Sequence, residues 1–216
     1  ANEYSKEGPI PFTVDPPCTD EFEPLARYSG LKEIERLSRF HALNHKAVGR
    51  QFAEDHHKNY EDLNLVVCHM GGGTSVAVHK NGKLIDGDNG LDGDGPFSTD
   101  RSCGLPVGQL IKMCYSGEYT YEQMKKKIKG FGGLMSYVNE TDVTKIEKRA
   151  FENSENECKE ALDAMCYQTA KEIGAMATVI NGKVDAILIT GGIANSEYLM
   201  NQIKQRVEFI APVYLY

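Results

Sequence analysis

Two long stretches of the chain repeat apolar residues every three or four positions. This spacing predicts amphipathic helices over about 38–56 and 155–180, each turning one face toward a core. The residues predicted to face the core are Phe40, Leu43, Ala47, Val48 and Phe52 in the first helix, and Leu162, Met165, Cys166, Thr169, Ile173, Met176, Ala177 and Ile180 in the second.

Short apolar runs bounded by turn residues predict the strands of a single sheet. Three of them follow one another closely, and Asn81-Gly82 is a hairpin signal, so they predict an antiparallel meander. A later strand–helix–strand unit predicts a right-handed parallel crossover. We therefore expect an α/β fold with a mixed sheet flanked by helices. The predicted strands are 10–14, 63–70, 74–80, 83–87, 184–190 and 208–215, and the shorter predicted helices are 106–115, 120–129, one after Thr141, and 195–206.

Composition places the chain among ordinary globular proteins. Of its 216 residues, 41% are hydrophobic and 25% are charged, and the net charge of -7 argues against a nucleic-acid partner. No apolar run is long enough for a membrane span, and no signal peptide is visible. The six cysteines include no Cys-x-x-Cys pair, which favours reduced thiols over a disulfide or metal framework. We expect a cytoplasmic protein with no membrane partner.

A first glycine loop, Gly71-Gly72-Gly73, separates two strand-like runs. A loop from strand to strand excludes the P-loop and the Rossmann fingerprint, because both of those open a helix. Three successive glycines allow positive φ angles and can turn several N–H groups toward a phosphate, with Thr74 and Ser75 as further hydroxyl donors. The alternative is a plain hairpin turn, although a two-residue turn needs fewer glycines.

A second glycine loop, Gly191-Gly192, joins an apolar strand to a helix that begins near Asn195 or Ser196. Ser196 is a candidate N-cap, and a helix start offers free amides to an anion. Taken alone, this motif is equally consistent with a tight strand–helix turn. The two loops in this order match the layout of the actin–hexokinase–acetate kinase superfamily, in which the first loop holds the outer phosphates of a nucleotide.

Within that superfamily the whole chain resembles the acetate/butyrate kinases. The sequence of the arginine-bearing loop, residues 91–108, is closer to that of butyrate kinases than to that of acetate kinases. The resemblance implies an actin/hexokinase-like (ribonuclease H-like) fold, ATP or ADP and Mg²⁺ as cofactors, and a homodimer or higher homo-oligomer. The segments that carry it are IPFTVDP (10–16), FHALNHKAV (40–48), HMGGGTSVAVHKNG (69–82), LDGDGPFSTDRSCGLPVG (91–108) and AKEIGAMATVINGKVDAILITGGIANS (170–196).

The resemblance also assigns candidate site residues. It places the family's catalytic arginine at Arg101, a phosphoryl-oxygen donor at His69 and an aspartate near magnesium and the acyl substrate at Asp15. Apart from the resemblance, these residues could be a solvent-facing arginine, a structural histidine and a turn residue. A guanidinium suits the role because it can clamp two oxygens at once. The nucleotide- and phosphate-binding candidates are Gly71, Gly72, Gly73, Thr74, Gly191, Gly192 and Asn195, and no metal ligand is certain.

Asp92 and Asp94 alternate with glycines, which invites a calcium interpretation. No suitably placed glutamate completes such a loop, so we favour hydrogen bonds that shape the loop. The lysine-rich run 125–130 is interpreted as a solvated helix end.

The family's opening hairpin and its acidic carboxyl-terminal helix have no counterpart here. We expect residues 1–216 to be one C-terminal nucleotide-binding domain with a helical insertion around 105–155, in a chain that lacks the N-terminal domain. The alternative is a small domain that ends on an edge strand.

The predicted function is phosphorylation of a short-chain carboxylate, butyrate first, to an acyl phosphate by ATP, or the reverse reaction. These 216 residues alone are expected to be an incomplete and inactive portion. The alternatives are a nucleotide-binding or dimerisation module without turnover, and an acetate or branched-chain fatty acid kinase. A phosphatase or chaperone-like ATPase would leave the loop around Arg101 unexplained.

Overall fold

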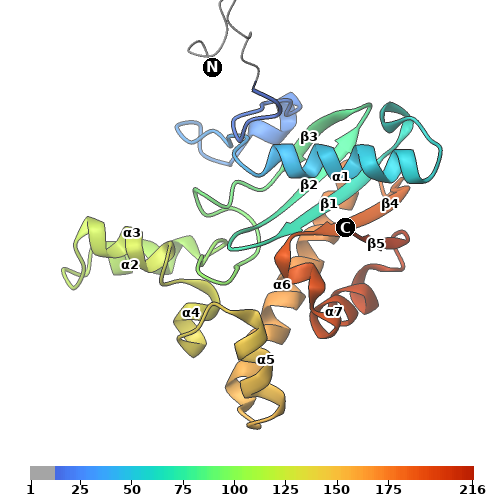
Figure 1. Ribbon diagram of the computed structural model, residues 1–216. Helices are drawn as coiled ribbons and strands as arrows, with labels where there is room; N and C mark the ends of the chain where they lie inside the picture. The colour runs from blue at the N-terminus through green and yellow to red at the C-terminus, as the bar shows by residue number, and fades with distance from the viewer. Residues whose placement is uncertain (1–12) are drawn as a thin grey trace, which may run out of the picture.

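The computed structural model describes residues 13–216, which form a five-stranded mixed sheet with helices on both faces (Figure 1). The strand order is β3-β2-β1-β4-β5. Strands β1, β2 and β3 pair antiparallel, whereas β4 pairs parallel to both β1 and β5, so the predicted mixed sheet is confirmed. The strands are β1 (Leu65–Met70), β2 (Thr74–Lys80), β3 (Lys83–Gly87), β4 (Ala186–Thr190) and β5 (Val213–Leu215).

The helices fall into two groups around this sheet. One group begins the described chain, and the larger group lies between β3 and β5 (Figure 1). The α-helices are α1 (Ala42–Asp55), α2 (Val107–Cys114), α3 (Tyr121–Ile128), α4 (Gly133–Val138), α5 (Val143–Phe151), α6 (Asn156–Val179) and α7 (Glu197–Val207), and the 3₁₀ turns are η1 (Pro24–Arg27), η2 (Tyr60–Asp62) and η3 (Gly192–Asn195).

The central strand β1 is buried on both faces. Successive side chains of a strand point to opposite faces, and here Leu65 and Val67 pack in a cluster with α1, whereas Val66 and Cys68 pack in a cluster with α6. This double burial explains why β1 reads as a continuous apolar run rather than an alternating one. It also fixes the carboxyl end of β1, where the first glycine loop begins.

The meander turns where the sequence predicts. Asn81 and Gly82 connect β2 to β3 with φ angles of 52° and 72°. Two successive residues with positive φ are the requirement of a two-residue type I′ hairpin, and Asn-Gly meets it at low cost. The Asn-Gly prediction is confirmed.

The first long helix is confirmed, but only part of its predicted face is buried, namely Phe40, Val48 and Phe52. Leu43 is 47% exposed and Ala47 is exposed, whereas His45 and Lys46 are buried. Both polar side chains have a partner inside: His45 Nε2 bonds Ser75 Oγ at 2.9 Å, and Lys46 Nζ donates to Glu21 at 2.8 Å. His45 Nδ1 has no hydrogen-bond partner among the described residues. Hydrophobic periodicity cannot identify a face on which buried polar groups find partners.

The second long helix buries its predicted face. Every α6 residue named above is buried, as is Ile180, which follows the helix. The prediction of a core helix over about 155–180 is therefore confirmed.

Three other predictions differ from the structure. The last strand is much shorter than 208–215, because α7 continues to Val207 and Phe209 is 83% exposed. Helix α4 (Gly133–Val138) lies between the predicted helix 120–129 and the one after Thr141, where no helix is predicted. The first predicted strand lies mostly in residues 10–12, outside the described residues, and Thr13 and Val14 are not in a strand.

The six cysteines all lie within the described residues, and none forms a disulfide. Over residues 13–216, no helix combines the length and the apolar character that crossing a membrane requires.

Candidate active site

The first glycine loop closes the hairpin between β1 and β2, with Met70 paired to Thr74. None of Gly71, Gly72 and Gly73 has a positive φ, so the expectation that positive φ angles build a phosphate nest here is wrong. The Gly71 N–H donates to Gly73 O at 2.9 Å. The N–H groups of Gly72 and Gly73 donate to no group among the described residues, which leaves two amides for a ligand.

Close approach, rather than backbone conformation, explains Gly73. A Cβ at this position would lie 2.5 Å from Arg101 Nη1 and 2.9 Å from its Cζ. The guanidinium of Arg101 therefore rests directly on the Gly73 backbone, and any side chain there would displace it. The fold thus brings together a glycine and an arginine that are 28 positions apart.

The loop that carries Arg101 is tied to the glycine loop. Ser98 Oγ donates to Gly72 O at 2.8 Å, and Thr99 Oγ1 donates to the same oxygen at 3.2 Å. On its other side the Arg101 loop is bonded to the stretch from α3 to α4: Gly130 N donates to Asp100 O at 2.7 Å. Leu134 N likewise donates to Ser98 O at 3.1 Å. Side-chain hydroxyls on one side and backbone hydrogen bonds on the other therefore hold the Arg101 loop, although Arg101 lies in no helix or named strand.

Arg101 lines a cavity of about 200 Å³ together with His69, Gly73 and Thr74. Within the described part of the chain, Arg101 Nε and Thr74 Oγ1 are buried and have no hydrogen-bond partner. Buried polar atoms are nearly always satisfied, so two orphaned donors in one cavity point to a ligand that accepts hydrogen bonds. A guanidinium beside a hydroxyl and free amides suits an oxyanion such as a phosphoryl group.

His41 and His69 line this cavity with ring centroids 4.8 Å apart, but their hydrogen bonds differ. His69 Nδ1 lies 2.8 Å from Asn44 Oδ1, so this nitrogen carries the proton and Nε2 has a lone pair. His41 Nδ1 accepts from Asn44 N at 3.3 Å, so its Nε2 carries the proton. Burial and the neighbouring His41 lower the pKa of His69 to about 4, which keeps it neutral near pH 7. The donor role expected of His69 requires a proton on Nε2, and the bond to Asn44 opposes it.

A second cavity of about 610 Å³ lies on the other side of the glycine loop. Gly71 and Gly72 line it from the hairpin, and Gly192 and Asn195 line it from the turn after β4. The two glycine loops therefore face one space. The predicted Ser196 cap is also confirmed, since its Oγ accepts from Leu199 N at 3.0 Å at the start of α7.

Gly191 belongs to the fold rather than to the cavity lining. It adopts φ 97° and ψ 169°, a region that only glycine enters readily. A Cβ there would overlap the backbone of Met70, at the end of β1. This glycine lets the turn after β4 pass against β1, and so brings Gly192 beside the first glycine loop.

The structure does not place Asp15 in either cavity. Its carboxylate pairs with Arg50 at 3.0 Å and with Lys46 at 3.6 Å, both on α1. Asp92 accepts from Asn89 Nδ2 at 2.8 Å, and Asp94 pairs with Arg36, as a loop-shaping role requires. Across residues 13–216, no three His, Cys, Asp or Glu side chains are grouped to hold a metal ion.

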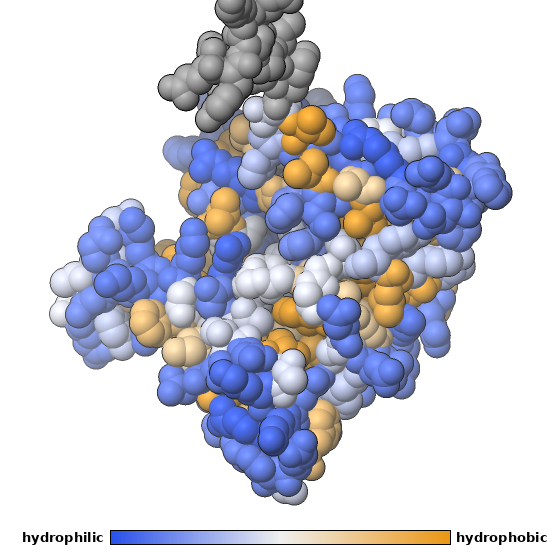
Figure 2. All heavy atoms as spheres, in the orientation of Figure 1, coloured by the Kyte–Doolittle hydropathy of each residue, from blue (hydrophilic) through white to orange (hydrophobic). Residues whose placement is uncertain are grey.

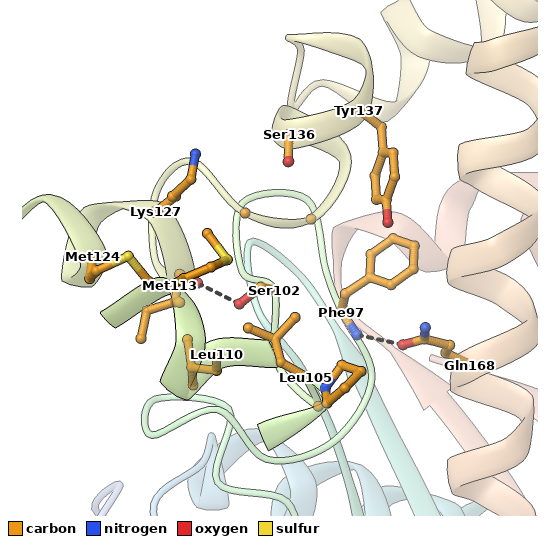
Figure 3. Close-up of a pocket in the computed structure, with 15 residues that line it drawn as sticks. Phe97, Ser102, Leu105, Leu110, Met113, Met124, Lys127, Ser136, Tyr137 and Gln168 are labelled. Atoms are coloured by element: carbon orange, nitrogen blue, oxygen red, sulfur yellow. Dashed lines mark hydrogen bonds between the residues drawn. The ribbon is translucent and has the colours of Figure 1, made fainter. Parts of the chain in front are cut away.

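A third cavity, of about 310 Å³, lies behind the Arg101 loop between α2, α3 and α4 (Figure 3). Its walls are mainly apolar and include Phe97, Leu110 and Met113, and none of the predicted site residues lines it. Ser102, next to Arg101, faces it and donates to Ile128 O at 3.3 Å (Figure 3). On this side the Arg101 loop borders a cavity rather than a filled core, and backbone hydrogen bonds hold it in place.

Sequence reasoning missed several residues that line these cavities. Arg39 and His41 line the Arg101 cavity, and Asp142 and Glu147 line the larger one. Arg39 and His41 precede a helix far upstream of Arg101, so no local motif connects them to it. Asp142 caps α5 through Oδ1, which accepts from Thr144 N at 3.0 Å, and a cap signal does not reveal a cavity.

Comparisons with known proteins agree with this geometry. The model of the acetokinase family matches residues 28–211. Butyrate kinase 1 of Clostridium acetobutylicum is 51% identical over 217 residues, covering 100% of this chain and 61% of that protein. A probable butyrate kinase of Bacteroides thetaiotaomicron is 49% identical over 95% of this chain and 58% of its own length. The chain thus spans about three fifths of these curated relatives.

Solved structures show the same fold. An acetate kinase of Porphyromonas gingivalis superposes with a TM-score of 0.80 at 23% identity, over 88% of this chain and 49% of that one. An acetate kinase of Entamoeba histolytica gives 0.78 at 20% identity, over 88% of this chain and 51% of that one. The predicted actin/hexokinase-like fold is confirmed.

Proposed function

The chain belongs to the acetokinase family, and on that premise we propose that the whole protein is a carboxylate kinase. It transfers the γ-phosphoryl group of ATP to a short-chain acid, butyrate first, and yields an acyl phosphate and ADP, or runs in the reverse direction. The chain contributes the C-terminal nucleotide-binding domain, in which α2 to α5 form a helical insertion between β3 and α6.

The orphaned donors of the Arg101 cavity carry this proposal. Arg101 Nε and Thr74 Oγ1 are buried without a hydrogen-bond partner, beside the free N–H of Gly73, and the only ion-pair contact of Arg101 Nε among the described residues is with Asp100 Oδ1, at 3.9 Å. Phosphoryl transfer depends on in-line positioning and on positive charge around the equatorial oxygens. One carboxylate oxygen attacks the γ-phosphorus, the bond to the β-phosphate oxygen breaks, and ADP leaves with that electron pair. The carboxylate is already ionised near pH 7, so the attack requires no general base.

The two cavities suit two ends of one nucleotide. The larger cavity holds Asp142 and Glu147, whose oxygens accept hydrogen bonds from ribose hydroxyls and would repel phosphates. Gly71 and Gly72 lie between this cavity and Arg101. We place the nucleoside in the larger cavity, the inner phosphates along the glycine loop, and the γ-phosphoryl group beside Arg101.

The described residues do not by themselves make a magnesium site. No cluster of three ligating side chains exists within 13–216, and Asp15 is paired with two cations. Mg²⁺ commonly reaches phosphoryl-transfer sites on substrate phosphates with few protein ligands. When bound, the ion would neutralise phosphate charge, and we assign it no ligand here.

The acyl group belongs in the Arg101 cavity, whose lining is of mixed character. Phe40, Leu91 and Pro17 are its apolar members, whereas Arg39 and Arg101 supply positive charge. A short aliphatic carboxylate matches a wall of this mixed character. The preference for butyrate over acetate or branched-chain acids rests on the curated relatives.

The proposal includes self-association. Helix α2 is apolar, yet none of its side chains is buried, and Val107 and Ile111 are 67% and 53% exposed. Figure 2 shows patches of apolar surface among hydrophilic residues in this view. Multi-angle light scattering should report a homodimer or larger species, and a monomer at micromolar concentration would contradict this part.

A hydroxylamine-trapping assay tests the reaction itself. ATP and butyrate are incubated with this chain, and separately with a longer chain matching the relatives' length, and acyl phosphate is trapped with hydroxylamine. We expect the longer chain to form product and this chain to bind ATP without turnover. Arg101→Gln should lower the longer chain's rate by at least 10³-fold, a typical loss on removing a transition-state arginine. Arg206→Gln, on the surface of α7, is the matched control.

Absence of acyl phosphate from the longer chain, with ATP still bound, would instead support a nucleotide-binding module without turnover.

A further inference from the structure

We infer that Asn44 is a positioning residue that sets opposite proton positions on His41 and His69. The inference deepens the proposed function, because it concerns the same cavity. It starts from one residue on the first turn of α1 that touches both imidazoles. Neither histidine contacts the other through a hydrogen bond, so each depends on its bond to Asn44.

The side chain of Asn44 orients His69. The Oδ1 atom lies 2.8 Å from His69 Nδ1, and a carbonyl oxygen can only accept. The neutral imidazole must then keep its proton on Nδ1. The Nε2 atom faces the glycine loop: it is 3.2 Å from the position that a Cβ on Gly71 would occupy. His69 therefore presents a lone pair toward the glycine loop, where it can accept from a water or a hydroxyl.

The backbone of Asn44 orients His41. The Asn44 N–H donates to His41 Nδ1 at 3.3 Å, so the imidazole of His41 serves as the N-cap of α1. An Nδ1 that accepts leaves the proton of the neutral ring on Nε2. His41 is exposed and lines the Arg101 cavity. It can therefore offer an N–H to a phosphoryl oxygen, the role that His69 cannot take in its tautomer.

Burial reinforces the division of roles. His69 is half-buried, and its pKa of about 4 keeps it neutral, so it does not bring a second positive charge beside Arg101. Asn44 is suited to this arrangement because a neutral amide orients a ring without adding charge. An aspartate at this position would favour a doubly protonated His69.

The tautomers can be measured directly on this chain. A long-range ¹H–¹⁵N correlation spectrum of protein labelled in histidine, at pH 7.5, distinguishes protonated from unprotonated ring nitrogens. His41→Gln and His69→Gln identify the two sets of signals. We expect His69 protonated at Nδ1 and His41 protonated at Nε2. A His69 signal protonated at Nε2 in the native chain would overturn the inference.

Three variants of α1 complete the test. Asn44→Ala should move His69 toward the Nε2-protonated form and leave His41 unchanged, because the backbone N–H remains. Asn44→Asp should restore the Nδ1 proton and raise the pKa of His69 by at least one unit. Gln51→Ala, exposed on the same helix and bonded to Asp55, should change neither histidine. An unchanged His69 in Asn44→Ala would overturn the inference.

Titration with inorganic phosphate separates the two histidines by role. We expect the His41 Nε2 signal to shift on binding, and His41→Ala to weaken phosphate binding about tenfold, the size of one hydrogen bond to a charged group. A shift confined to His69 would reverse the assigned roles. The tautomer measurements stand even if the longer chain makes no acyl phosphate, so this inference and the proposed function can fail separately.

Discussion

The two glycine loops use the same residue for different physical reasons. In the hairpin loop no glycine has a positive φ, and Gly73 is required because the Arg101 guanidinium lies on its backbone. In the loop after β4, Gly191 is required by its φ of 97° and by the backbone of Met70. Gly192, its neighbour, has nothing within 4 Å of a Cβ position and lines a cavity.

The difference shows which glycines serve the fold and which serve the ligand. A substitution at Gly191 disturbs two backbones, neither of which can move aside. A substitution at Gly73 disturbs the end of a flexible side chain, which can move but then no longer occupies its place in the cavity. We expect the first to unfold the protein and the second to spare the fold and impair binding.

Gly191→Ala should have the largest effect on stability. The residue would keep a conformation that costs a non-glycine residue about 1–3 kcal/mol, and its methyl group would overlap Met70. We expect a loss of about 3 kcal/mol or more in the free energy of unfolding, measured in urea. Gly174→Ala, in α6 with nothing within 4 Å of a Cβ position, is the matched control. A change below about 1 kcal/mol at Gly191 would contradict the comparison.

Acid should destabilise the fold through the histidines on the hairpin side. Burial lowers the pKa of His79 to about 3 and that of His45 well below its usual value. Between about pH 6.5 and these lowered folded-state pKa values, each histidine binds a proton only in the unfolded state. The free energy of unfolding therefore falls as the pH decreases. Burial raises the pKa values of Asp88 and Glu172, and the charge of Glu172 raises that of Asp88 further. These two carboxyls therefore give the free energy of unfolding the opposite dependence on pH.

His69 joins His45 and His79 in this range, because its folded pKa is about 4. If the two carboxyls retain one shared proton, three histidine protons less one carboxyl proton leave a net difference of about two protons. The free energy of unfolding should then fall by about 2.7 kcal/mol per pH unit below pH 6. Urea titrations at pH 7, 6 and 5 measure this slope, and a flat profile would argue against neutral buried histidines. Asp88→Asn removes the opposing group and should steepen the slope, whereas Asp92→Asn, exposed in the same loop, should not.

Gly73→Ala should impair the site while the fold survives. The added methyl group pushes Arg101 from its place, so we expect ATP to bind about 10- to 100-fold more weakly, the loss of a charge-assisted clamp. The free energy of unfolding should change by no more than about 1 kcal/mol. Isothermal titration calorimetry and urea denaturation on the same samples separate the two outcomes. Unfolding of this variant would show that Gly73 serves the fold as Gly191 does.

Gly192→Ala should have the smallest effect. Its φ is not positive and its Cβ position is open, so the free energy of unfolding should stay within about 0.5 kcal/mol. The methyl group projects into the larger cavity, and a few-fold loss of ATP affinity is expected there. A large loss of stability would mean that both glycines after β4 are structural.

Much of the fold follows from local patterns in the chain. The antiparallel meander, its Asn81-Gly82 turn and helix α6 depend on periodicity and turn chemistry that act within a few residues. The family likewise follows from consecutive motifs. The predicted burial is wrong where distant residues make a buried polar side chain favourable. His45 and Lys46 are buried on α1 because Ser75 and Glu21 supply hydrogen-bond partners.

The sequence by itself therefore determined the sheet, the family and the candidate residues Arg101 and Gly73. Only the tertiary structure decided that Arg101 lies on Gly73, that Asp15 is paired with cations of α1, and that His41 joins the cavity. The reason is physical: backbone preferences act over a few residues, whereas a binding site depends on which distant side chains and backbones come within van der Waals or hydrogen-bond distance.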